Sequence, residues 1–153
     1  GQHLTFKGGT SLSKAWGLAA LRLGLGFASE KIIDLFNKVK PPYNINLASQ
    51  QLGMQALLKV DEVNRNIRNI VEQRRKVQQQ LEQFDFIKKI YPSDSNFILI
   101  KTDDADRLYQ YLLTYKIIVR NRSKEPLCKN CIRITIGTET ENITLINALK
   151  NYE

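Results

Sequence analysis

The stretch DEVNRNIRNIVEQRRKVQQQLEQF, residues 61–84, decides how this chain is organised. Its apolar residues recur at helical spacing along one stripe, and charged or polar residues cover the other positions. The stripe consists of Val63, Ile67, Ile70, Val71, Val77, Leu81 and Phe84. This pattern predicts one amphipathic helix about 35 Å long, which is enough to bridge two domains. We predict no catalytic residue on it.

Beyond Phe86 the apolar residues change from helical to alternating spacing. The pattern predicts strands over 87–91 and 96–101, a helix over 104–115, strands over 117–120 and 131–136, and a last helix over 139–151. Thr138 and Glu141 have the spacing of a capping box at the start of that helix. The order β-β-α-β-β-α predicts a small α+β layer, one sheet backed by helices.

On the other side of the long helix, we predict a strand over 22–28, a helix over 30–38 and a helix over 47–58. Ser29 is a candidate N-cap for the first helix, and Pro41-Pro42 ends it. Residues 1–10 begin with Gly and look like a cloning remnant or a cut within a larger protein, so we leave them out of the fold. His3, the only histidine, therefore has no predicted role. The predicted domains are residues 11–58 and 59–153.

The composition is that of a globular chain: 153 residues, 42% of them hydrophobic and 25% charged. No run of about 20 apolar residues and no secretory leader is seen, so we expect a soluble, cytoplasmic protein with no membrane partner. The formal net charge of +8 raises a nucleic-acid alternative. Basic residues are spread along the chain, and the longest run, Arg74-Arg75-Lys76, lies within the predicted long helix. We therefore expect solvated helix faces and no nucleic-acid partner.

The two cysteines form a Cys128-x-x-Cys131 motif. One such pair cannot complete a four-ligand zinc site, which needs two further Cys or His ligands. A redox dithiol favours a helix N-terminus, whereas Cys131 begins a predicted strand. We interpret both as ordinary thiols and predict no metal.

Residues 11–24, SLSKAWGLAALRLG, combine two hydroxyls, an amine and a guanidinium in apolar company. An amine among apolar residues and near another cation is a nucleophile toward an aldehyde. Ser11, Ser13 and Arg22 are suitable donors for a phosphate dianion. Together with Lys14 they could hold a phosphorylated aldehyde cofactor. An ordinary serine-rich turn beside a lysine has the same pattern, so the residues alone leave both interpretations open.

This segment resembles the cofactor-lysine signature of the class II, fold-type-I aminotransferases, which use pyridoxal 5'-phosphate. The matching pattern is a hydroxyl residue, any residue, Ser, Lys, a Gly-Leu-Ala-like stretch and Arg-x-Gly. The resemblance implies that Lys14 binds the cofactor covalently and, once released, moves the proton between substrate and cofactor. It also implies that Ser11, Ser13 and Arg22 hold the cofactor phosphate.

A second constellation combines IVRNRS, residues 118–123, with CIRITIGT, residues 131–138, and Glu141-Asn142. Arg120 and Arg133 fall on predicted neighbouring strands, and two guanidinium forks facing one cavity suit an anionic substrate. This stretch is similar to the histidinol-phosphate aminotransferases. The resemblance implies that both arginines bind the substrate's phosphate or carboxylate; it implies no such role for Arg122.

The resemblance implies an α/β chain, the C-terminal part of a fold-type-I aminotransferase. Residues 11–58 would be a remnant of the large cofactor-binding domain, and residues 59–153 the small domain. The implied reaction moves an amino group between L-histidinol phosphate and 2-oxoglutarate, in a homodimer. The fragment alone is expected to be inactive. The alternatives are another class II enzyme, acting on aromatic amino acids or decarboxylating a phospho-amino acid, and a non-catalytic interaction domain.

Overall fold

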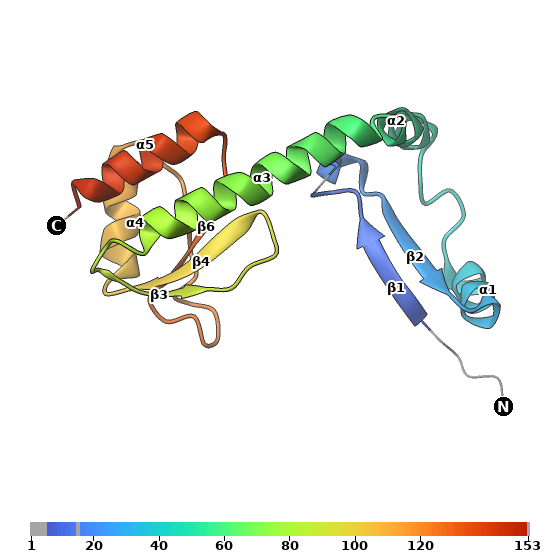
Figure 1. The fold of residues 1–153 in the computed structure, drawn as a ribbon. Coiled ribbons are helices and arrows are strands. Elements are labelled where there is room, and N and C mark those ends of the chain that lie inside the picture. Colours follow the sequence, from blue (N-terminus) through green and yellow to red (C-terminus); the bar gives the residue numbers. More distant parts are fainter. Residues whose placement is uncertain (1–5, 15, 153) are drawn as a thin grey trace. The chain divides into compact units, whose positions relative to one another are not determined.

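The computed structural model describes residues 6–14 and 16–152, so His3 lies outside the described residues. The chain divides into two compact units between Ile67 and Arg68 (Figure 1). This division falls inside the helix α3 (Val60–Leu81), which is therefore shared by both units. The domain limits expected from the sequence, 11–58 and 59–153, stay a prediction.

The first unit pairs a two-stranded antiparallel sheet with short helices. The helices expected over 30–38 and 47–58 are confirmed to within one residue. The elements are β1 (Phe6–Ser11), a 3-10 turn η1 (Ala19–Leu21), β2 (Gly24–Ala28), α1 (Glu30–Val39) and α2 (Leu47–Leu57).

The structure corrects three expectations in this unit. Residues 6–10, which the sequence analysis leaves out of the fold, form β1 together with Ser11. The strand expected from Arg22 begins at Gly24, because Arg22 ends η1 in the left-handed conformation, at φ 55°. Ser29 stands at the N-cap of α1, but its side chain makes no capping hydrogen bond. Asn46 does cap α2, where its Oδ1 accepts from the Ser49 N–H at 2.8 Å.

The second unit contains a four-stranded antiparallel sheet in the order β3-β4-β6-β5. With its helices it follows the predicted β-β-α-β-β-α order, which is thereby confirmed (Figure 1). Its elements after α3 are β3 (Ile87–Tyr91), β4 (Phe97–Thr102), α4 (Ala105–Thr114), β5 (Arg120–Asn121), β6 (Cys131–Thr135) and α5 (Glu139–Lys150).

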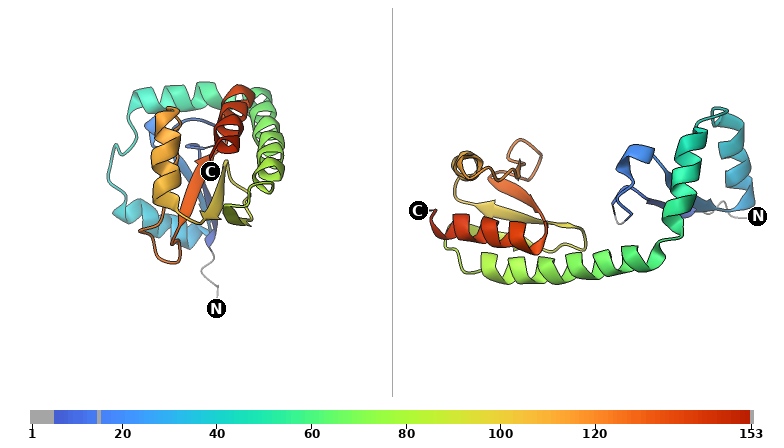
Figure 2. Two further views of the ribbon diagram at one scale, coloured as in Figure 1. Left: turned by 90° about the vertical axis from the view of Figure 1, so that its left-hand side faces the viewer. Right: turned by 90° about the horizontal axis from the view of Figure 1, so that it is seen from above.

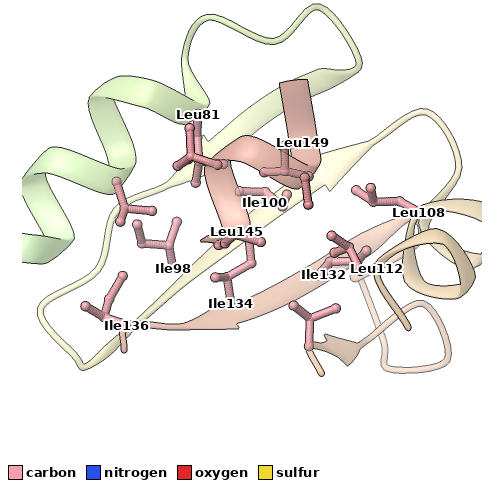
Figure 3. Packing of buried hydrophobic residues seen from close by; sticks show 14 of the residues in the cluster. Leu81, Ile98, Ile100, Leu108, Leu112, Ile132, Ile134, Ile136, Leu145 and Leu149 are labelled. Carbon is pink, nitrogen blue, oxygen red and sulfur yellow. The ribbon is translucent and has the colours of Figure 1, made fainter. Parts of the chain in front are cut away.

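The core lies on one face of this sheet, because side chains alternate between faces along each strand. Ile98 and Ile100 of β4 and Ile132 and Ile134 of β6 are buried on that face. Helices α3, α4 and α5 supply most of the rest of the cluster: Val77, Leu81, Ala105, Leu108, Leu112, Leu145, Ile146, Ala148 and Leu149, together with Val119 and Ile136 from the connecting segments. Figure 3 shows this packing, with Leu81, Leu108, Leu112, Ile136, Leu145 and Leu149 labelled among these residues. The opposite face of the sheet carries the alternate strand residues, which point away from this core.

Polar contacts join α3 to α5, which lie side by side (Figure 2). The buried Asn142 side chain donates to Oε1 of Gln73 at 3.0 Å and to the Gly137 carbonyl at 3.1 Å. Lys76 Nζ lies 3.7 Å from Oε1 of Glu139. The predicted capping box of Thr138 and Glu141 is present at the first turn of α5. These contacts anchor the start of α5, directly after β6, against α3.

Two predicted boundaries differ from the structure by more than one residue in this unit. The strand expected over 117–120 is reduced to β5, Arg120–Asn121. Lys116 adopts φ 60° after α4, and the Ile117 N–H donates back to the Leu112 carbonyl at 3.0 Å, so this backbone closes the helix and cannot join the sheet. The long helix ends at Leu81 and not at Phe84, which packs against the core from a turn.

Candidate active site

The four residues predicted to bind the cofactor lie at one end of the β1–β2 hairpin. Ser11 pairs with Gly24, and the Leu12 N–H donates to the Leu23 carbonyl at 3.2 Å. The segment between these pairs carries Ser13, Lys14 and Arg22. The hairpin thus gathers residues that are up to eleven positions apart in the sequence at the same end of one small sheet.

The two serines form a local hydrogen-bonded pair. The Ser11 hydroxyl donates to Oγ of Ser13 at 2.7 Å, and the Ser13 N–H donates to Oγ of Ser11 at 3.2 Å. The Lys14 carbonyl accepts from the N–H of Gly17, which has φ 66° and so suits a glycine. An anion bound at this turn would replace the hydrogen bond between the two serines. It would accept instead from both hydroxyls and from a backbone N–H. The donors here therefore match a phosphate.

Lys14 and Arg22 are both exposed. The sequence predicts that the Lys14 amine lies among apolar residues. In the structure Lys14 is exposed, and the described part of the first unit does not enclose its amine. The amine is free to reach a ligand, but its apolar surroundings are not provided by these residues.

Arg120 and Arg133 are direct cross-strand partners on β5 and β6. The expectation that they lie on neighbouring strands is confirmed. Directly opposed residues of an antiparallel pair project from the same face of the sheet, with Cβ atoms about 5 Å apart. Since Ile132 and Ile134 face the helices, both arginines belong to the opposite face of the sheet. Their roles stay predictions.

This opposite face of the sheet is positively charged. By the strand register, it carries Lys89 of β3 and Lys101 of β4 in addition to the two arginines. The remaining strand positions on this face hold no carboxylate: Tyr91, Phe97, Leu99, Cys131 and Thr135. Four cations without a neutralising acid in the strands make this face attractive to an anion.

Arg133 is held by an aromatic ring, which the sequence analysis missed. Its guanidinium carbon lies 5.1 Å from the centroid of the Phe97 ring. Its Nε is buried and has no hydrogen-bond partner among the described residues. By contrast, Arg122 Nη1 donates to Oε1 of Glu125 at 3.2 Å. The alternation of residues along β4 indicates that Phe97 and Leu99 share one face of the sheet. Which residue of β6 lies beside Phe97 follows only from the register between the two strands.

The family model for "aminotransferase class I and II" matches residues 9–149. The chain belongs to the class I and II aminotransferases. Histidinol-phosphate aminotransferases of Flavobacterium psychrophilum and Flavobacterium johnsoniae are 50% and 46% identical to it, each over 92% of this chain and 40% of the relative. The solved histidinol-phosphate aminotransferase of Clostridium acetobutylicum has the same fold, with a TM-score of 0.84, 23% identity, and coverage of 93% of this chain and 44% of that one.

The chain thus spans about 40% of the length of the curated aminotransferases that it matches. Aminotransferases of this family depend on pyridoxal 5'-phosphate. The expected α/β fold class is confirmed by the structure and by this family's solved fold.

In this aminotransferase chain both cysteines are free. Burial raises the pKa of the Cys131 thiol, and the neighbouring Cys128 raises it further. A thiol with a raised pKa is a weak nucleophile at neutral pH, which fits our interpretation of an ordinary thiol. No group of three or more His, Cys, Asp or Glu side chains placed to hold a metal is found over residues 6–14 and 16–152. Within those same residues, no helix is both long and apolar enough to cross a membrane.

Proposed function

We propose that this chain is the C-terminal part of an aminotransferase that moves an amino group between L-histidinol phosphate and 2-oxoglutarate. The observation that carries the proposal is the direct pairing of Arg120 with Arg133 on a sheet face whose strands hold no carboxylate. The identity of 46% to 50% with histidinol-phosphate aminotransferases supports this substrate class.

The hairpin end of the first unit is the proposed cofactor site. When bound, pyridoxal 5'-phosphate supplies an aldehyde and a ring that withdraws electrons from the substrate carbon. Ser11, Ser13 and Arg22 hold its phosphate, because two hydroxyls and a guanidinium offer several donors to one dianion. Lys14 would hold the cofactor through Nζ. Once the substrate's amino group takes its place on the aldehyde carbon, the freed Lys14 amine would be the base that accepts the proton from the substrate carbon.

The arginine pair is the proposed substrate site. A guanidinium presents two parallel N–H groups to a carboxylate or phosphate, so Arg133 and Arg120 can grip one anion from two sides. The phosphate of L-histidinol phosphate and a carboxylate of glutamate or 2-oxoglutarate are the anions that take this place in turn.

The isolated chain is proposed to be inactive and the complete enzyme to be a cytoplasmic homodimer. An amine that holds the cofactor is not enough for turnover, because the cofactor ring must also be oriented and its nitrogen protonated. The exposure of Lys14 supports this, since the described residues leave the amine without an enclosing site. We therefore expect cofactor binding without amino transfer.

The test is to mix the chain with pyridoxal 5'-phosphate, reduce with borohydride and locate the added mass by peptide mass spectrometry. We expect the label on Lys14, its loss in Lys14→Arg, and its retention in Lys38→Arg, a matched exposed lysine of α1. A label that spreads over several lysines, or survives in Lys14→Arg, would remove the proposed cofactor site.

A substrate panel tests the second half of the proposal. Calorimetry with L-histidinol phosphate, 2-oxoglutarate and an aromatic 2-oxo acid should give binding for the first two and weaker binding for the third. A preference for the aromatic acid would instead favour another class II enzyme.

A further inference from the structure

Arg133 differs from Arg122, one of the two arginines in the neighbouring segment, in what contacts its side chain. Arg122 is paired with Glu125, so its charge is partly neutralised. Arg133 is only partly exposed, lies over the Phe97 ring, and keeps a buried Nε with no partner among the described residues. The buried Nε shows that the inner part of this guanidinium is fixed by packing, and no described residue accepts a hydrogen bond from its terminal N–H groups.

An aromatic ring holds a guanidinium in a way that a carboxylate does not. The ring contacts the flat face of the group, and the N–H donors, which lie in the plane, remain available. The positive charge is also retained, because the ring carries no net charge. Stacking therefore orients an arginine and leaves it ready for an anion.

Phe97 is itself firmly placed. It begins β4 and pairs with Thr135. The pair of Leu99 and Arg133 lies two positions along the strands, on the same face of the sheet. The Ser93 hydroxyl donates to the Phe97 carbonyl at 2.6 Å. The turn before it is anchored to α3, where Arg74 Nη1 donates to the Ser95 carbonyl at 2.6 Å. The ring thus projects from a backbone that is fixed on both sides.

We propose that Phe97 is a positioning residue for Arg133, which it orients from one face so that the terminal N–H groups bind the anionic end of the substrate. This inference rests on the proposed function, because it concerns the same anion site. It adds that an aromatic ring, and not an acidic partner, sets the direction and charge of the guanidinium.

The test follows the ¹⁵N signal of the Arg133 side chain in the whole chain, assigned by its disappearance in Arg133→Lys. Without ligand, we expect Nε of Arg133 to be rigid in the wild type and in Phe97→Tyr, which keeps the ring, and mobile in Phe97→Leu. The control is Tyr91→Leu on the same face, where the ring lies 4.9 Å from Nζ of Lys89; this variant should leave Arg133 rigid. Far-UV circular dichroism and thermal unfolding verify that each variant is folded.

Inorganic phosphate is then titrated into each folded variant. Phosphate should shift the Arg133 signal in the wild type, and its affinity should fall about three- to thirty-fold in Phe97→Leu, the range of a cation–π contact. Phe97→Tyr, which keeps an aromatic ring, should bind phosphate with the wild-type affinity. The inference is overturned if Arg133 stays rigid in Phe97→Leu, if Tyr91→Leu mobilises it equally, or if Phe97→Tyr is itself mobile.

The two proposals fail in different ways. If Phe97→Leu mobilises Arg133 but phosphate leaves the wild-type signal unchanged, Phe97 orients the arginine as inferred and the anion site of the proposed function is wrong. If phosphate shifts the signal equally in wild type and Phe97→Leu, the anion site stands and the role of Phe97 is wrong.

Discussion

At the scale of single residues, the surroundings of an arginine decide what it can bind. Arg122 and Arg133 lie in neighbouring segments, but only Arg122 has a carboxylate, that of Glu125, within ion-pair distance among the residues that the structure describes. An exposed or half-exposed ion pair of this kind contributes little to stability. It does, however, occupy donors that an anionic ligand would need. The structure therefore supports the exclusion of Arg122 from the predicted substrate site.

This contrast predicts different effects for two matched substitutions. Arg133→Gln should weaken 2-oxoglutarate binding by about 10- to 100-fold, because hydrogen bonds to a charged group contribute about 1.5–3 kcal/mol. Arg122→Gln should change the affinity by less than about twofold, since its guanidinium already bonds to Glu125. Titration calorimetry of the three chains measures both. Equal losses in the two variants would show that bulk charge, and not a defined fork, attracts the anion.

At the scale of elements, local sequence signals act at helix ends. The Thr138 N–H donates to Oε2 of Glu141 at 2.7 Å, and the Glu141 N–H donates back to the Thr138 hydroxyl at 3.4 Å. The same carboxylate lies beside Gly137, where the Cβ of any larger residue would come within 2.6 Å of Oε2, so glycine suits this position. The capping box therefore sets where α5 begins.

The pH dependence of stability should report this cap. Hydrogen bonds from the backbone and then the side chain of Thr138 lower the pKa of Glu141 below its ordinary value of 4.5. Because the folded-state pKa is the lower one, the cap stabilises the fold fully above about pH 4.5 and loses its effect as the pH falls through the folded-state pKa. Urea unfolding of Glu141→Gln should show a weaker loss of stability on acidification than the wild type.

Glu82→Gln, in the exposed segment after α3, is the matched control and should keep the wild-type acid sensitivity. If Glu141→Gln retains the full acid-induced loss, the cap does not contribute to it. Thr138→Ala provides a second measure, because loss of an N-cap side chain destabilises a protein by about 1 kcal/mol at any pH where the cap is formed.

At the scale of the whole molecule, the two units differ in how much apolar surface they bury. The second unit encloses a continuous core, whereas the buried residues of the first unit's described part are few: Leu12, Ser49 and Gly53. Large apolar side chains are exposed on α1 and its neighbours, among them Phe27, Leu35, Phe36 and Val39. Exposed apolar side chains on neighbouring elements favour association with another chain.

We therefore expect the chain in isolation to associate with a second copy through the first unit. Light scattering should show a mass that rises with concentration, and the double variant Leu35→Ser, Phe36→Ser should reduce that rise. The control is Ile143→Ser on α5, which replaces one of the exposed apolar residues of the second unit and should leave the rise unchanged. A chain that stays monomeric at all concentrations would contradict this expectation.

Local spacing was enough to predict most helices and strands. The stripe of residues 61–84, the capping box and the change of period after Phe86 each depend on neighbours a few positions away, and α1, α2, α4, α5, β3, β4 and β6 were placed within about one residue. The Lys14 segment and the two arginines could also be singled out, because their residue types and spacing carry the family pattern.

The pairing of distant segments was decided by the tertiary structure. Residues 6–10 became a strand because β2 offered them a partner. The strand expected from residue 117 begins only at Arg120, because the Ile117 N–H closes the end of α4. The register that sets Arg120 opposite Arg133, and Phe97 against the latter, joins residues up to thirty-six positions apart. Register depends on which faces of several strands become buried together, a property that no single stretch of chain contains.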